Sequence, residues 1–97
     1  MLHLVAFPPT DSARLRDLQH SLQAGDQVVF IEEGLLFCAE GQACQDALGS
    51  LAAATLYCQA DDGARAYNRA AQPAVTPVTW DAIAALTETH TPCLSWY

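Results

Sequence analysis

The most constraining feature of this sequence is an uninterrupted run of β-branched and aromatic residues, Val28-Val29-Phe30-Ile31, within the segment Gln27 to Glu32. Successive side chains of a strand point to opposite faces of the sheet, so a strand with one wet face alternates apolar and polar residues. This run does not alternate. We therefore expect a central strand that is covered on both faces.

Segments typical of strands alternate with segments typical of helices along the chain. Strands are expected at Leu2–Ala6, Gln27–Glu32, Ala54–Cys58, Val75–Val78 and Cys93–Tyr97, and helices near 12–25, 35–39, 42–48, 61–70 and from Thr79 or Asp81 to His90. This order predicts an α/β fold with a mostly parallel sheet of four to five strands and helices on both faces. The 97 residues suffice for a single domain, residues 1–97, and exclude two.

Individual residues mark the expected ends of these elements. Asp11 is one of three adjacent residues that can cap the first helix, which should then bury a stripe of leucines. Pro77 interrupts the fourth strand and predicts an edge position, because proline donates no ladder hydrogen bond. Leu35–Ala39 fits either a strand continuation or a helical turn, and we favour a short helix. Asp61 and Asp62 can cap the helix expected to run to about Ala70.

The charge of the chain excludes several classes of partner. Eleven Asp and Glu stand against four basic residues, all of them Arg, for a formal net charge of −7 at pH 7. Nucleic-acid binding draws most of its affinity from Lys and Arg at phosphates, so direct contact with DNA or RNA is not expected. An anionic membrane surface is disfavoured for the same reason, whereas protein partners with basic patches are favoured.

Nothing in the sequence predicts export, a membrane span or a bound cofactor. The opening segment, Met1 to Pro9, lacks a basic region, and no window approaches the ~20 apolar residues that span a bilayer, so a cytoplasmic protein is expected. The glycines never fall into a phosphate-binding spacing. The cysteines form no C-x-x-C pair or His/Cys cluster, which disfavours both a disulfide framework and a metal site: Cys38, Cys44, Cys58 and Cys93.

Cys58 is the residue with the best claim to chemistry. It lies at the predicted carboxyl end of a strand and before the expected helix start at Asp61, where backbone N–H groups can lower a thiol pKa. A thiolate there could carry a persulfide. Against this, free cysteine often packs as a small apolar residue, and the adjacent acids oppose thiolate formation. Both interpretations of Cys58 remain open on the residues alone.

Several segments resemble the TusB/DsrH family of sulfur-relay proteins. These are the opening Met1-Leu2-His3, the segment from Ala24 to Gly34 with its pattern G-D-x-V-V-x-x-E-E-G, the Leu56-Tyr57 strand and the ending Ser95-Trp96. They occur in the family's order and spacing over almost the full length of the chain. The resemblance implies a DsrE/DsrF/DsrH-like fold and a hetero-oligomer with TusC-like and TusD-like sister subunits. In that family the assembly passes persulfide sulfur along carrier proteins toward 2-thiouridine at the tRNA wobble position.

The resemblance also bears on the cysteines. DsrH-type members carry a relay cysteine in the first helix, and the matching residue here is Leu18, so the chain is closer to TusB-type members. The catalytic cysteine of TusD/DsrE subunits ends a strand and is followed seven residues later by Arg, and Cys58 with Arg65 is similar. TusB-type chains usually lack that cysteine. Cys58 is therefore a chance apolar substitution or a departure from the family pattern.

The resemblance implies a non-catalytic or weakly catalytic structural subunit of a sulfurtransferase complex. A persulfide carrier that uses Cys58 is the first alternative, and a DsrH-like role in sulfur oxidation is another. Trp96 and Tyr97 at the end of the chain, together with Phe37, are candidate interface anchors, because aromatic residues are enriched at binding hot spots. They fit the core of the domain equally well.

Overall fold

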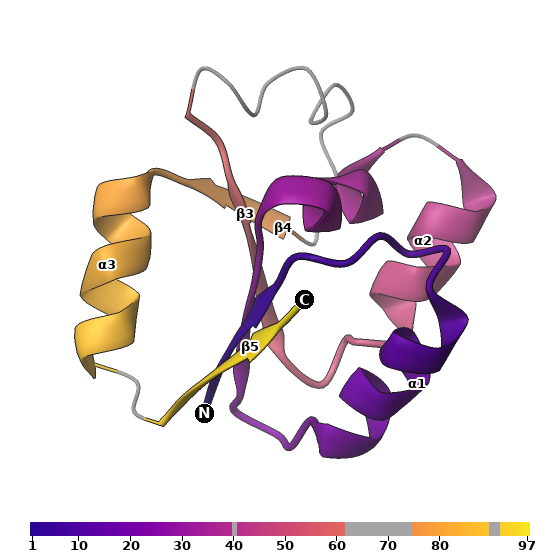
Figure 1. The fold of residues 1–97 in the computed structure, drawn as a ribbon, viewed down its shortest axis with the longest axis horizontal. Helices are drawn as coiled ribbons and strands as arrows, with labels where there is room; N and C mark the ends of the chain where they lie inside the picture. Colours follow the sequence, from indigo (N-terminus) through magenta and orange to yellow (C-terminus); the bar gives the residue numbers. More distant parts are fainter. Residues whose placement is uncertain (40, 62–74, 90–91) are drawn as a thin grey trace.

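The computed structural model describes residues 1–39, 41–61, 75–89 and 92–97, and the account below concerns these residues. A five-stranded sheet forms the centre of the molecule, with helices on its two sides (Figure 1). Along the chain the elements are β1 (Leu2–Val5), α1 (Ser12–Ser21), β2 (Gln27–Phe30), the 3-10 helix η1 (Glu32–Cys38), α2 (Gln42–Gly49), β3 (Thr55–Gln59), β4 (Val75–Val78), α3 (Trp80–Thr89) and β5 (Cys93–Trp96).

The strands lie in the order β4-β3-β2-β1-β5, and every neighbouring pair is parallel. The β2 strand lies at the centre, with Phe30 opposite both Val5 of β1 and Cys58 of β3. This confirms the prediction that the uninterrupted run forms a central strand. The edge position of β4, predicted from Pro77, is also confirmed.

Two apolar clusters on opposite faces of the sheet explain why the run does not alternate. Val28 and Phe30 belong to the cluster beneath α1, η1 and α2, whereas Val29 and Ile31 pack with Ile83 of α3 on the other face. All four residues of the run, the first three of them in β2, are buried. Figure 1 shows α3 on one side of the sheet and α1 and α2 on the other, so the prediction of helices on both faces is confirmed.

Local chemistry sets the helix ends. The Asp11 side chain accepts a hydrogen bond from the backbone N–H of Arg14, as expected of the residue that caps α1. The Thr79 hydroxyl likewise accepts from the N–H of Ala82 at the start of α3, at 3.3 Å. The first helix ends at Ser21, before Gly25, which has a φ of 91° in the turn to β2.

The segment after β2 crosses closely over the end of β1. The short helix favoured at 35–39 is present, but it begins earlier, at Glu32, and is a 3-10 helix. A side chain at Gly34 would collide with the backbone oxygen of Val5, so only glycine allows this close approach. Gly34 thereby fixes η1 against the sheet. Of the helix predicted from Asp61 to Ala70, the structure describes only Asp61, and Arg65 lies outside the described residues. The Asp61 carboxylate accepts hydrogen bonds from the Gln59 side-chain amide and from the backbone N–H of Trp80 at the start of α3.

Candidate functional site

Cys58 lies near the carboxyl end of β3, on the face of the sheet that η1 and α2 cover. It is opposite Phe30 of β2 and Pro77 of β4, and one residue before the strand ends at Gln59. Its side chain is 2% exposed and belongs to the larger apolar cluster. A sulfur donor can therefore reach Cys58 only if neighbouring side chains move.

Cys38, the last residue of η1, makes a side-chain hydrogen bond with Cys58. This bond, followed by burial, raises the pKa of the Cys38 thiol far above its ordinary value. On the adjacent helix α2, the Cys44 thiol donates to the backbone oxygen of Leu36 at 3.3 Å. The path of η1 thus gathers three thiols that the sequence separates.

This thiol cluster, Cys38, Cys44 and Cys58, contains no disulfide. The spacing of the cysteines in the sequence does not predict this cluster, because the contact between Cys38 and Cys58 depends on how η1 packs against β3. Only the thiolate is a strong nucleophile, so the raised pKa of Cys38 disfavours nucleophilic attack by this thiol. Were sulfur loaded onto Cys58, however, Cys38 would be a thiol within reach of it.

Leu18, at the position where the resemblance places a relay cysteine in DsrH-type members, is fully buried in α1. It packs in the same cluster as Val5 and Phe30. The ten residues of α1 include no cysteine. This helix therefore presents packing surface to the sheet and offers no thiol.

A second buried group of polar residues joins the middle of β1 to β5 and to the start of β2. Fully buried His3 has Nε2 at 3.0 Å from the Asp26 carboxylate, and the Trp96 indole Nε1–H donates to His3 Nδ1 at 3.1 Å. Since an indole nitrogen only donates, Nδ1 accepts and the proton of the neutral ring sits on Nε2, from which it is donated to Asp26.

The Asp26 carboxylate is the hub of this group. Burial raises its pKa, but hydrogen bonds from His3, from the backbone N–H of Gln23 and from the Met1 amino group outweigh burial and lower the pKa to about 2. The carboxylate is thus ionised and fully engaged at neutral pH. We interpret the group as structural, because its side chains form hydrogen bonds within the protein that connect β1, β5 and the residue before β2.

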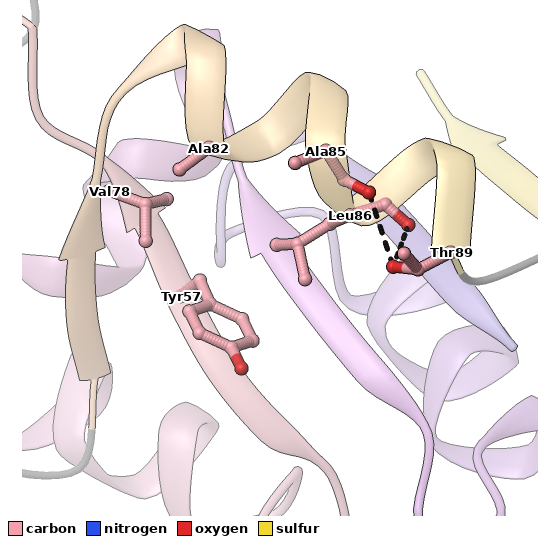
Figure 2. Close-up of a pocket in the computed structure, with 6 residues that line it drawn as sticks. All are labelled: Tyr57, Val78, Ala82, Ala85, Leu86 and Thr89. Carbon is pink, nitrogen blue, oxygen red and sulfur yellow. Dashed lines mark hydrogen bonds between the residues drawn. The ribbon is translucent and has the colours of Figure 1, made fainter.

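An apolar groove lies on the opposite face of the sheet, between α3 and the strands β3 and β4 (Figure 2). Its cavity volume is about 290 Å³, and it is lined by Tyr57, Val78, Ala82, Ala85, Leu86 and Thr89. Figure 2 shows the Tyr57 ring and the side chains of Val78 and Leu86 pointing into the same space. The lining is mostly apolar, and Tyr57 and Thr89 are the lining residues that carry a polar side-chain group.

The three candidate interface anchors have different surroundings. Phe37 is fully buried, stacked on Phe30 with ring centroids 4.7 Å apart and edge-on to Phe7 at 5.9 Å, which confirms the core interpretation for that residue. Trp96 is partly buried through its bond to His3. Tyr97 is 66% exposed and remains a candidate anchor.

The fold and these sites define a small α/β protein with an all-parallel five-stranded sheet and a thiol cluster beneath a short helix. A family model described as DsrH like protein matches residues 8–92, most of the chain, and the chain therefore belongs to the DsrH-like family. This membership confirms the TusB/DsrH resemblance and indicates a role related to sulfur relay. No curated protein matches the chain. Within the described residues, no helix is long and apolar enough to cross a membrane.

Proposed function

We propose that this chain is a structural subunit of a cytoplasmic sulfurtransferase complex. Its partners are TusC-like and TusD-like sister subunits, and the complex passes persulfide sulfur toward 2-thiouridine at the tRNA wobble position. The chain holds the complex together, while the thiol that carries the sulfur belongs to a sister subunit.

The observation that carries this proposal is Leu18. The resemblance implies a relay cysteine in the first helix of DsrH-type members, and this chain has a fully buried leucine at the matching position. A buried leucine contributes about 1.5 to 3 kcal/mol to folding and cannot bind sulfur. The net charge of −7 also favours a role away from tRNA, with acidic surface turned to solvent or to basic partners.

Co-purification tests the proposal directly. The chain is expressed alone and together with its two sister subunits, and the native mass of each preparation is measured. We expect a complex that contains all three chains, and loss of tRNA thiolation when the gene for this chain is deleted. A chain that stays monomeric and binds neither sister subunit overturns the proposal.

The second candidate function is that of a persulfide carrier that uses Cys58. The observation that favours this function is the neighbouring thiol of Cys38. A donor persulfide would transfer its outer sulfur to Cys58 and leave as a thiol. The Cys58 persulfide would then pass its outer sulfur to the thiolate of an acceptor protein, which becomes the persulfide while Cys58 returns to a thiol.

Labelled sulfur and intact-mass analysis separate the two candidates. The complex is loaded with a persulfide donor, and the mass of each chain is read under non-reducing conditions. A structural subunit gains no sulfur, whereas a carrier gains one sulfur atom that Cys58→Ser removes and the exposed-site control Cys93→Ser does not. An unmodified chain beside a loaded sister excludes Cys58 as the carrier.

The remaining alternative, a DsrH-like role in sulfur oxidation, differs in where the sulfur goes. Neighbouring genes for sulfur oxidation enzymes, together with unchanged 2-thiouridine in a deletion strain, would favour it. Genes for TusC-like and TusD-like proteins and a loss of 2-thiouridine would favour the tRNA pathway.

A further inference from the structure

The sheet face that carries α3 is only partly covered. Neighbouring strands lie about 4.8 Å apart, so five strands span about 19 Å, whereas a helix with its side chains is about 10 to 12 Å wide. Ile83 places α3 over β1 and β2, since it packs with Leu2 and Val29. Among the described helices, α3 is the one on this face (Figure 1). Part of β3 and β4 therefore stays uncovered beside α3.

This uncovered part is the apolar groove of Figure 2. Its α3 side is formed by four residues spaced i, i+3, i+4 and i+7, which lie on one side of the helix: Ala82, Ala85, Leu86 and Thr89. The two alanines leave the groove open, because their methyl groups reach only a short way from the helix. The four residues span about two turns of α3. A groove of this length fits the apolar side chains from about two turns of another helix.

The charges beside the groove are acidic. Asp81 precedes Ala85 by four residues and Glu88 follows it by three, so both exposed carboxylates lie next to the lining residues on the outer side of α3. The arginines that the structure describes, Arg14 and Arg16, belong to α1 on the opposite face of the sheet. Within the described residues, no Lys or Arg side chain therefore balances the acidic rim of the groove.

Glu88 does not stabilise the helix that carries it. It lies in the last turn of α3, where the exposed C=O groups favour a cation and an acidic side chain is unfavourable. Among the described residues, no ion pair involves Glu88. Asp81 differs, because an acidic side chain in the first turn also stabilises the helix. The Glu88 carboxylate is thus available to a partner at the rim of the groove.

We propose that this groove binds an amphipathic helix of another protein. The apolar side chains of that helix enter between α3 and β4, and its flanking Lys or Arg side chains face Asp81 and Glu88. Charge selects a basic helix, because the acidic rim and the net charge of −7 repel an acidic helix and a second copy of this chain. The inference does not depend on the sulfur-relay role.

The neighbouring sheet edge disfavours an extended strand as the occupant. Val78 of β4 accepts a hydrogen bond from the backbone N–H of Ala60, at 2.8 Å, so the alternate residue Pro77 directs its backbone outward. Proline has no N–H to donate to an added strand. A helix needs no hydrogen bonds from the edge, because its own backbone groups are paired within it.

Two synthetic peptides of about 18 residues, long enough to form helices alone, test the inference. One has leucines spaced i, i+3, i+4 and i+7 with lysines beside them, and its twin has Glu in place of each Lys. Each peptide is titrated into the full, isotope-labelled chain and followed by NMR. We expect the Lys peptide to shift the amide signals of Tyr57, Ala82 and Ala85.

The Lys peptide should bind at least about tenfold more tightly than its twin at low salt, and the difference should shrink as salt rises. Equal binding of the two peptides, or shifts confined to other parts of the surface, overturns the inference. Binding of neither peptide also overturns it, whether or not the chain associates with itself.

Ala82→Leu and Ala84→Leu form a matched pair of variants. Ala82→Leu fills the groove and should weaken binding of the Lys peptide at least about tenfold. Ala84→Leu adds the same side chain at an exposed position of α3 that does not line the groove, so it should bind like the wild type. A folded Ala82→Leu variant that binds normally contradicts the inference.

Glu88→Lys tests the rim separately and covers the case in which Ala82→Leu fails to fold. Folding should survive, because a cation suits the last turn of a helix. The variant should bind the Lys peptide several-fold more weakly and the Glu peptide more tightly. Glu33→Lys changes the net charge equally at an exposed residue of η1, on the other face, and should have little effect. Equal effects of the two variants would exclude a local contact at Glu88.

Discussion

The two faces of the sheet are packed to different degrees. On the α1 face, α1, η1 and α2 cover the sheet, and large side chains such as Phe7, Phe30 and Phe37 are at most 2% exposed. On the α3 face, α3 covers the sheet among the described residues and leaves a groove of about 290 Å³ beside it. The α1 face provides most of the core, whereas the α3 face has space for larger side chains.

The largest expected effect comes from truncating the core of the α1 face. Phe37→Ala removes a fully buried ring stacked on Phe30, so the free energy of unfolding should fall by about 3 to 5 kcal/mol. Leu86→Ala on the α3 face removes a partly buried side chain beside the groove and should cost only about 1 kcal/mol. Urea denaturation of both variants measures the difference, and equal losses would refute the contrast.

The next effect concerns the buried carboxylate. Asp26 has a pKa lowered from 3.8 to about 2, so its ionised form stabilises the folded state above pH 3.8. That contribution, about 2 kcal/mol, is lost as the pH falls through about 2. Asp26→Asn should lose it at neutral pH and flatten the pH dependence of unfolding between pH 4 and pH 2.

Asp11→Asn is the matched control for this prediction. The N–H and guanidinium of Arg14 lower the pKa of Asp11 too, but this carboxylate and its partner lie at the surface, where ion pairs contribute little. Its pH profile should stay close to that of the wild type. If both variants change the profile equally, burial of the Asp26 group does not explain the effect.

A smaller effect is expected from the indole of Trp96. Trp96→Phe keeps an aromatic ring but removes the N–H that donates to His3 Nδ1, so unfolding should become easier by about 1 kcal/mol. Nitrogen NMR of His3 provides a second measurement, because loss of the donor frees the ring to exchange between tautomers. A single Nε2–H tautomer in the variant would show that Asp26 alone orients the ring.

The fold was predictable because its signals are local. The run Val28 to Ile31 indicates a central strand, Pro77 an edge strand and Asp11 a helix start, and each depends only on neighbouring residues. The sites depend on distant residues. Trp96 meets His3 across 93 positions. Cys38 meets Cys58 only because Gly34 lets η1 pass close over β1, a contact that no spacing rule encodes.

The last prediction compares the packing of the two faces by adding the same side-chain volume to each of them. The expected change in stability on the α3 face is the smallest of those predicted here. Ala82→Leu places three carbons toward the groove and should stabilise the fold by less than about 1 kcal/mol, because the added groups fill existing space. Ala47→Leu makes the same change in α2, at a residue buried in the α1-face cluster, where overpacking should cost about 1 to 3 kcal/mol. Thermal unfolding of the two variants should therefore shift in opposite directions. A loss of stability in Ala82→Leu similar to that in Ala47→Leu would mean that the α3 face is as tightly packed as the other.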